Sequence, residues 1–151
     1  MLAEVLIALA LVAIGLSAFA SALPVAGAAV SEGARLSTAT FLAAARLEEV
    51  RAAAWSEAPP VDRLGVSGAA PSAPQSGGTT TFADEAALPA PYAGYSRQVR
   101  IRDCGLPPGC GAVISARLRQ VTVTVAYRPV TASGVAALDK AVTVTTLVAQ
   151  R

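Results

Sequence analysis

The residues best suited to covalent chemistry in this chain are its two cysteines, Cys104 and Cys110. They enclose the segment Gly-Leu-Pro-Pro-Gly, whose glycines and prolines favour a tight turn that brings the thiols together. Two cysteines in a chain without histidine do not complete a structural zinc site, and their spacing is not that of a C-x-x-C motif. The pattern therefore favours a structural disulfide, formed in an oxidising compartment.

A lone carboxylate, Glu4, lies near the beginning of a long apolar stretch, and the next charged residue is Glu32. An ionised carboxylate is costly in hydrocarbon, where it usually has a cationic partner. Because Glu4 is so close to the end of the stretch, it is equally able to lie at the level of lipid headgroups. Two interpretations of this residue stay open, a buried charge with a partner and an interfacial charge.

Five arginines in the C-terminal half form the third candidate group. Residues 95–151 carry eight basic against two acidic side chains, whereas residues 1–94 carry four basic against eight acidic ones. A basic half is able to meet an anionic partner such as DNA or an acidic helix of a neighbouring chain. A nucleic-acid surface also needs interleaved aromatic residues, of which few lie near, and a solvated strand face is the other interpretation. The arginines are Arg97, Arg100, Arg102, Arg117 and Arg119.

No other group of residues indicates a reaction. Without histidine, the chain lacks the commonest general base and the commonest metal ligand. The sequence shows no glycine-rich phosphate loop, no nucleophile paired with a base and no carboxylates at metal-binding spacing. We therefore expect a protein that is not an enzyme and that binds neither a metal nor a cofactor.

The element that must position Glu4 is a helix over residues 1–30. These residues are apolar at nearly every position, and their charge-free run exceeds the roughly 20 residues that span a bilayer core. A helix that is apolar all round belongs in a membrane or a dry core. Pro24 is expected to kink it, because proline lacks an amide proton and clashes with the preceding turn. Residues 1–30 are thus predicted to lie in lipid or against other chains.

Residues 31–57 are predicted to continue the same helix with an amphipathic pattern. Charged residues lie mostly off its apolar face, and Pro59 and Pro60 are the first signals that stop it. A continuous helix of about 55 residues would be on the order of 80 Å long, which is too long for a compact domain of 151 residues. The predicted apolar face comprises Leu36, Ala39, Ala43, Leu47, Val50 and Ala54.

A loop and a sheet are predicted for the rest of the chain. Residues 58–94 are rich in Pro, Gly, Ala and Ser, so we expect an irregular segment with little to bury between Gly68 and Thr81. In residues 95–151 the apolar period becomes two, which indicates strands with one buried face. The fold class is therefore α+β, with the amphipathic helix packed on a three- or four-stranded antiparallel sheet. The predicted strands are Tyr95–Arg102, Val121–Tyr127 and Val142–Val148, the last two separated by Arg128–Gly134.

The segment Leu2-Ala3-Glu4-Val5-Leu6-Ile7-Ala8-Leu9 resembles the beginning of mature type IV pilins and type II secretion pseudopilins. In that family an apolar N-terminus is followed by a glutamate at the fifth mature position and then by a long apolar helix. The resemblance covers about residues 1–30 and continues more loosely through Phe41–Arg51. It implies the type IV pilin fold, with the first thirty residues as a helix of the filament core.

The resemblance also implies a function. The chain would be a structural subunit, minor or priming, of a type IV pilus or a type II secretion pseudopilus. A prepilin peptidase would remove a basic leader and methylate the new N-terminus. The subunit would wait in the inner membrane with its head in the periplasm or outside, until an inner-membrane assembly platform packs its helix against those of other subunits. Glu4 would match the family glutamate, which is thought to pair with the N-terminal amine of an adjacent subunit.

Three features depart from the family pattern. The glutamate is the fourth residue and no leader precedes it, so we expect Met1 to be an internal start or a trimmed end. Pro24 lies later than the kinking proline of major pilins, and the cysteine loop precedes the last strands, which favours a minor subunit. Two alternatives stay open, a DNA-uptake or adhesive subunit that uses a basic head, and an unrelated exported domain on a single-pass anchor.

Overall fold

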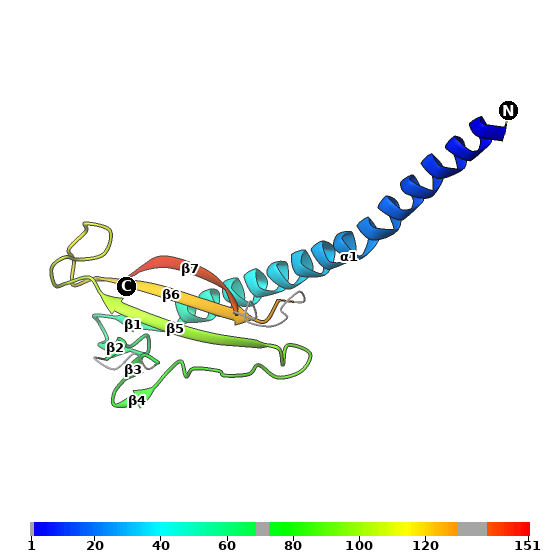
Figure 1. The fold of residues 1–151 in the computed structure, drawn as a ribbon. Coiled ribbons are helices and arrows are strands. Elements are labelled where there is room, and N and C mark those ends of the chain that lie inside the picture. The colour runs from blue at the N-terminus through cyan, green and yellow to red at the C-terminus, as the bar shows by residue number, and fades with distance from the viewer. Residues whose placement is uncertain (1, 69–72, 130–138) are drawn as a thin grey trace.

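A long helix and a small antiparallel sheet make up most of this computed structural model, which describes residues 2–68, 73–129 and 139–151 (Figure 1). Met1 and most of the predicted break Arg128–Gly134 lie outside these residues. The elements are α1 (Leu2–Ala52), β1 (Trp55–Ser56), β2 (Val61–Asp62), β3 (Gln75–Ser76), β4 (Thr79–Thr80), β5 (Tyr95–Asp103), β6 (Leu118–Tyr127) and β7 (Lys140–Ala149).

Helix α1 runs unbroken from the apolar stretch into the head, which confirms the predicted continuity, but it ends at Ala52. The predicted end at residue 57 is wrong. The amide of Ala53 donates to the carbonyl of Val50 (3.1 Å) in a tightened last turn. The chain then becomes extended, so that Trp55 is buried and pairs with Asp62 across β1 and β2. Burial of the large aromatic side chain of Trp55 favours this early end.

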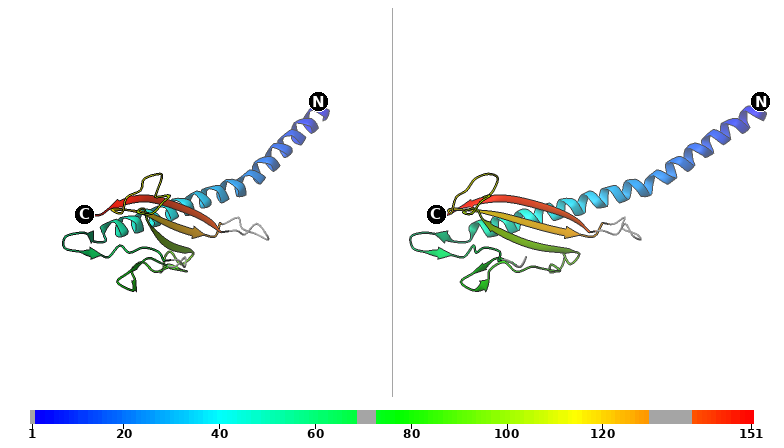
Figure 2. Two further views of the ribbon diagram at one scale, coloured as in Figure 1. Left: turned by 90° about the vertical axis from the view of Figure 1, so that its left-hand side faces the viewer. Right: turned by 60° about the vertical axis from the view of Figure 1, so that its left-hand side comes forward.

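The three predicted strands are confirmed as β5, β6 and β7, which form one antiparallel sheet in the order β5-β6-β7 (Figure 2). Strand β6 is central, and its inward residues from Val121 to Tyr127 are buried at alternate positions. The inward valines of β7 are only half-buried because β7 is an edge strand. The α+β class is therefore confirmed, with three strands in the main sheet.

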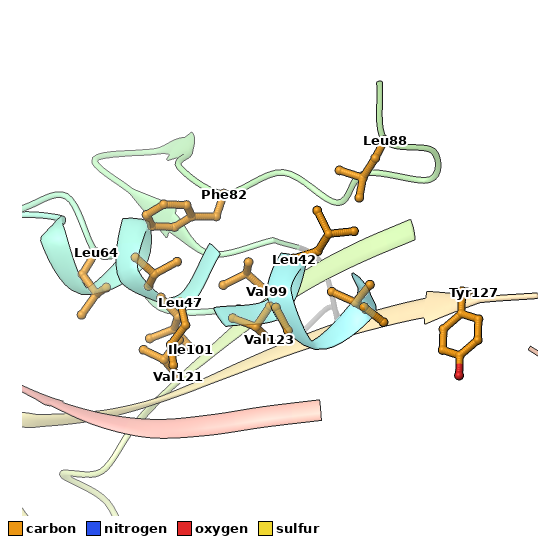
Figure 3. Packing of buried hydrophobic residues seen from close by; sticks show 14 of the residues in the cluster. Leu42, Leu47, Leu64, Phe82, Leu88, Val99, Ile101, Val121, Val123 and Tyr127 are labelled. Carbon is orange, nitrogen blue, oxygen red and sulfur yellow. The ribbon is translucent and has the colours of Figure 1, made fainter. Parts of the chain in front are cut away.

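The face of α1 that packs on the head differs from the predicted one at three positions. Leu36 is 49% exposed and Ala54 lies beyond the helix, whereas Leu42 is buried. In the view of Figure 3, Phe82 and Leu88 lie on one side of the helix and the strand residues on the other. The helix therefore has a second covering layer, which widens its buried face towards Leu42.

The segment 58–94 supplies that second layer through residues on both sides of the run Gly68–Thr81, for which we predicted little burial. In the described part of that run, Ala73 and Pro74 are buried. Leu64, Phe82 and Leu88 all belong to the hydrophobic core. Strands β3 and β4 form a small hairpin whose turn is Gly77–Gly78, and both glycines have positive φ angles, which glycine adopts without strain. A proline- and glycine-rich composition here reflects tight turns over a packed core.

Candidate functional site

The N-terminal half of α1 is the most unusual surface of this protein. None of its most apolar 18-residue stretch is buried, and by length and composition the helix is able to cross a membrane. An exposed apolar surface of this extent is the mark of contact with lipid or with other proteins. Its exposed large apolar side chains are Leu2, Val5, Leu6, Ile7, Leu9, Leu11, Val12, Ile14, Leu16, Phe19, Leu23, Val25 and Val30.

Glu4 lies in the first turn of α1, where a negative side chain interacts favourably with the helix dipole. No charged residue separates it from Glu32. At 1.5 Å per residue the intervening helix is about 40 Å long, close to the thickness of a bilayer with its headgroups. The two glutamates are therefore separated along the helix by about the thickness of one bilayer. Helix α1 continues through Pro24 and curves along its length (Figure 1), so proline does not interrupt the element.

The predicted disulfide between Cys104 and Cys110 is confirmed, and both residues are buried. It closes a loop at the end of the head that lies farthest from the N-terminus (Figure 1). Directly after it, Cys110 and Val113 exchange two backbone hydrogen bonds (2.9 and 3.1 Å). A side chain at Gly109 would approach the Val113 carbonyl oxygen to 2.3 Å, so only glycine fits there. The loop is thus held rigid by a covalent bond and by close backbone contact.

Replacing both cysteines by alanine is expected to lower the free energy of unfolding of the head by about 2 kcal/mol, because a loop this short removes that much chain entropy from the unfolded state. The measurement is urea unfolding of the full chain in detergent micelles, followed by the fluorescence of Trp55, the single tryptophan. Reduced wild-type protein is the control and should match the double variant. Equal stability of oxidised and reduced protein would contradict the prediction.

The five arginines proposed for an anionic partner do not share one surface. Arg97 and Arg119 lie on the inward face of the sheet, in the alternation that buries Val99 and Val121. Arg100 lies on the opposite face of β5, as the period of two requires. Side chains on opposite faces of a sheet do not bind the same partner face, so the structure divides this group. The remaining members are Arg102 at the end of β5 and Arg117 just before β6.

Carboxylates of the segment 58–94 engage two of these arginines on β5. Arg97 makes two hydrogen bonds to Glu85, at 2.7 Å from Nε and 3.1 Å from Nη2. Arg100 makes two to Asp84, at 2.6 Å from Nη1 and 2.7 Å from Nη2. Paired hydrogen bonds from one guanidinium are among the stronger polar contacts in proteins. They fasten the second covering layer to the sheet.

Arg119 is the most buried of the five, with 8% of its surface exposed. Its guanidinium makes two hydrogen bonds to Asp62, at 2.7 and 2.8 Å, and a third to the Gly65 carbonyl at 3.2 Å. The same group lies over the ring of Trp55, 4.2 Å from its centroid. A guanidinium between an aromatic face and a carboxylate satisfies both its charge and its planar shape. Arg119 therefore joins β6 to β1 and β2.

The opposite charges of the two halves of the sequence are thus matched largely inside the head. Arg117 also pairs with an acidic residue, Glu57, and both side chains are largely exposed. Among the five arginines, Arg102 alone makes no ion pair with the described residues. Sequence reasoning missed this pairing because it treated the basic half as a surface. The arrangement favours an internal role over a shared surface for DNA.

The ion pairs lower the pKa of three carboxyl groups. The chief cause is the hydrogen bond from the partner guanidinium, which lowers the pKa of Asp62 through Arg119 and the pKa of Asp84 through Arg100. The pKa of Glu85 is lowered in the same way by Arg97. In each case the charged form is held by contacts that exist only in the folded chain.

The stability of the head is therefore expected to fall in mild acid. Carboxyl groups whose pKa is lowered on folding contribute stability above their ordinary values, 3.8 for Asp62 and 4.5 for Glu85, and lose it as the pH drops towards the folded values. We expect the melting temperature to fall by roughly 5 °C between about pH 5 and pH 3. Thermal melts of the full chain in a non-ionic detergent test this. A variant with Asp62→Asn should show a shallower decline, and a flat profile in the wild type would contradict the assignment.

A polar junction joins α1 to the sheet where the apolar stretch ends, and no sequence pattern predicted it. The Nζ atom of Lys140 lies 2.6 Å from Glu32, and the hydroxyl of Tyr127 donates to the same carboxylate at 3.1 Å. Burial, and then the hydrogen bond to Glu32, raise the pKa of Tyr127. One turn on, Arg35 donates to the carbonyl of Arg128 at 2.6 Å. The one available signal was that Glu32 is the first charge after the apolar run.

In residues 2–68, 73–129 and 139–151 there is no group of three or more His, Cys, Asp or Glu residues able to hold a metal ion. The hollows of the described surface include two open ones. One of about 330 Å³ includes Tyr95 and Tyr127 in its lining, and one of about 270 Å³ lies beside Arg51 and the end of β7. Neither hollow contains residues arranged as a nucleophile with a base.

The fold and the exposed helix define an α+β protein with one N-terminal helix that is long and apolar enough to cross a bilayer. Comparisons with protein-family models, with curated proteins and with solved structures found no match. The assignment of a function therefore depends on the sequence pattern and on the geometry described above.

Proposed function

We propose that this protein is a structural subunit, minor or priming, of a filament of the type IV pilus or type II secretion pseudopilus kind. The observation that carries the proposal is one unbroken helix, Leu2–Ala52, whose first half is apolar and exposed and whose second half packs on a three-stranded sheet. The first half would anchor the subunit in the inner membrane before assembly and lie in the filament core afterwards.

The rigid junction between the two halves supports a filament role over that of an ordinary anchored domain. A tethered domain needs only a flexible link, whereas α1 continues through this region without a break. The contacts of Glu32 with Lys140 and Tyr127 fix the helix against the sheet just beyond the apolar stretch. Because the helix is held in this way, the position of its apolar half in a filament core would fix the position and orientation of the head.

Small residues along the exposed half of α1 also favour packing against other helices. A side chain added at Gly15 or Gly27 would meet no atom within 4 Å other than those of adjacent residues and the local helix backbone, so packing within the subunit does not require either glycine. Without a hydrophobic driving force in lipid, helices associate through close van der Waals packing at small residues. These positions are suited to receive the side chains of neighbouring subunits.

The proposal is tested by following the full chain in cells that produce it together with the assembly machinery. The protein is expected in the membrane fraction and, in a smaller amount, in filaments sheared from the cells or overproduced in the periplasm. Removal of the assembly platform should leave all of it in the membrane. A chain that never enters filaments while other subunits assemble normally would contradict the proposal.

A further inference from the structure

The two edges of the main sheet differ in the backbone hydrogen bonds that the described residues make to them. The outer edge of β5 is covered by the segment 58–94, which makes backbone hydrogen bonds to it at three positions. These bonds run from Leu88 N to Tyr95 O (3.0 Å), from Arg97 N to Glu85 O and from Glu85 N to Arg97 O (2.9 Å each), and from Ser67 N to Ile101 O (2.8 Å). An edge satisfied in this way has few groups left to offer another strand.

Among the described residues, none is hydrogen-bonded through its backbone to the outer edge of β7 between residues 141 and 149. Its register with β6 continues to Gln150, whose amide donates to the Arg117 carbonyl at 2.9 Å, so even-numbered residues face β6. In an antiparallel pair the intervening residues direct both backbone groups away from the partner. No backbone hydrogen bond joins these groups to another described residue. The residues are Ala141, Thr143, Thr145, Leu147 and Ala149.

The sequence of this edge lacks the features that keep edge strands apart. Natural sheets protect such edges with charges, prolines, bulges or short strands. Strand β7 is ten residues long, and residues 141–149 contain no charge and no proline. Its inward valines, including Val142 and Val144, are only partly buried against the core. An added strand would cover these valines as well as the backbone groups.

Beyond residue 149, this edge is already hydrogen-bonded to another part of the same chain. The amide of Arg151 donates to the Trp55 carbonyl at 3.0 Å, and the amide of Glu57 donates to the Arg151 carbonyl at 3.2 Å. Strand β1 thus occupies the position just beyond β7. A strand added along the edge could pair with residues 141 to 149. Beyond residue 149 it would meet β1 and the hollow beside Arg51. The available length is therefore fixed at about nine residues.

We propose that the β7 edge is a docking site for an extended segment of a different protein, which adds a fourth strand to the sheet. The fitting segment has up to about nine residues, alternates apolar with uncharged polar side chains and has free amides. Its apolar side chains would lie beside the half-buried valines of β7. This inference does not depend on filament assembly.

A second copy of this chain is a poor occupant of the edge. Helix α1 and β7 run in the same direction, from the anchored end to the far end of the head (Figures 1 and 2). An antiparallel pair of β7 strands would point the two apolar helices in opposite directions, which one membrane does not permit. A parallel in-register pair would place Lys140 beside Lys140 and Arg151 beside Arg151, and like charges repel. Identical subunits are therefore disfavoured in either orientation.

The probe for this site is a capped nine-residue peptide of alternating valine and threonine that carries a short uncharged solubilising tail and a fluorophore. Binding to the full chain in detergent micelles is measured by fluorescence anisotropy, and exchange of each backbone amide is followed by NMR. We expect binding to slow exchange at the odd-numbered residues of β7, such as Thr143 and Thr145. Exchange at the even-numbered residues, which already face β6, should change little.

Two controls separate backbone pairing from simple hydrophobic contact. The same peptide methylated on every backbone nitrogen should not bind. The variant Thr145→Pro removes one outward amide and should weaken binding roughly tenfold, the effect of about one net hydrogen bond, whereas Thr145→Ala keeps the amide and should bind nearly as wild type. Equal binding of the methylated peptide, outward amides already protected in the free chain, or self-association through β7 in place of peptide binding would each overturn the proposal.

Discussion

Replacing Glu4 by alanine is expected to abolish entry of the protein into filaments while leaving its amount in the membrane unchanged. Helix α1 carries no other charge before Glu32, so the substitution makes its first turns wholly apolar and favours membrane insertion. In a filament core the same carboxylate would lie among apolar helices, where it needs a cationic partner. Loss of that charge pair removes the polar contact that sets the position of one subunit against the next.

The size of this effect is expected to be at least tenfold in the ratio of filament to membrane protein, because a charge pair in a medium of low dielectric constant is worth more than about 1.4 kcal/mol. The measurement is quantitative immunoblotting of sheared filaments and of washed membranes. Glu4→Gln, which keeps the size but not the charge, should behave as Glu4→Ala does.

Glu48 offers a matched control for this experiment. It lies on the same helix, but its side chain is 69% exposed and pairs with Arg51 at 3.0 Å. Exposed pairs of this kind contribute little to stability, so Glu48→Gln should enter filaments as the wild type does. Normal filament entry of Glu4→Ala would refute the role of Glu4 and weaken the proposed function. Failure of the Glu48 variant as well would assign the effect to charge on the helix in general.

Replacing Arg119 by alanine is expected to lower the free energy of unfolding of the head by about 2–4 kcal/mol. Removal of one partner of a buried ion pair costs about 3–5 kcal/mol, and the lower figure here reflects that Asp62 is 42% exposed and regains water. The substitution also removes the group that packs on Trp55 and leaves the Gly65 carbonyl without its side-chain partner. A loss of this size is a large share of the stability of a small domain.

The control for Arg119 lies two residues away. Arg117 pairs with Glu57 at the surface, with 68% of the arginine side chain and 64% of the glutamate side chain exposed. Its replacement by alanine should cost no more than about 1 kcal/mol. Urea unfolding of both variants, followed by far-ultraviolet circular dichroism, compares them without depending on the tryptophan signal. Equal losses of unfolding free energy in the two variants would contradict the prediction, because they would show that the buried, stacked Arg119 contributes no more stability than the exposed Arg117.

The sequence by itself determined the long helix, the three strands of the main sheet and the inward faces of those strands. A charge-free run longer than a bilayer core predicts an exposed apolar helix, because no compact head of this size is able to cover it. A period of two predicts β5, β6 and β7 and their inward residues, because successive side chains of a strand point to opposite faces. The disulfide follows from two cysteines flanking a short turn. All of these signals are local, and all are confirmed.

Only the tertiary structure decided which residues far apart in the chain meet. Helix α1 ends at Ala52 because Trp55 is buried against Arg119, a contact that no local pattern encodes. Leu42 is buried because the segment 58–94 forms a second layer over the helix. The same segment engages the arginines of β5 and covers its edge, while no described residue is hydrogen-bonded along the edge of β7 from residue 141 to residue 149. Periodicity reports which side of an element is apolar, but the partner on that side is chosen by the packing of the whole chain.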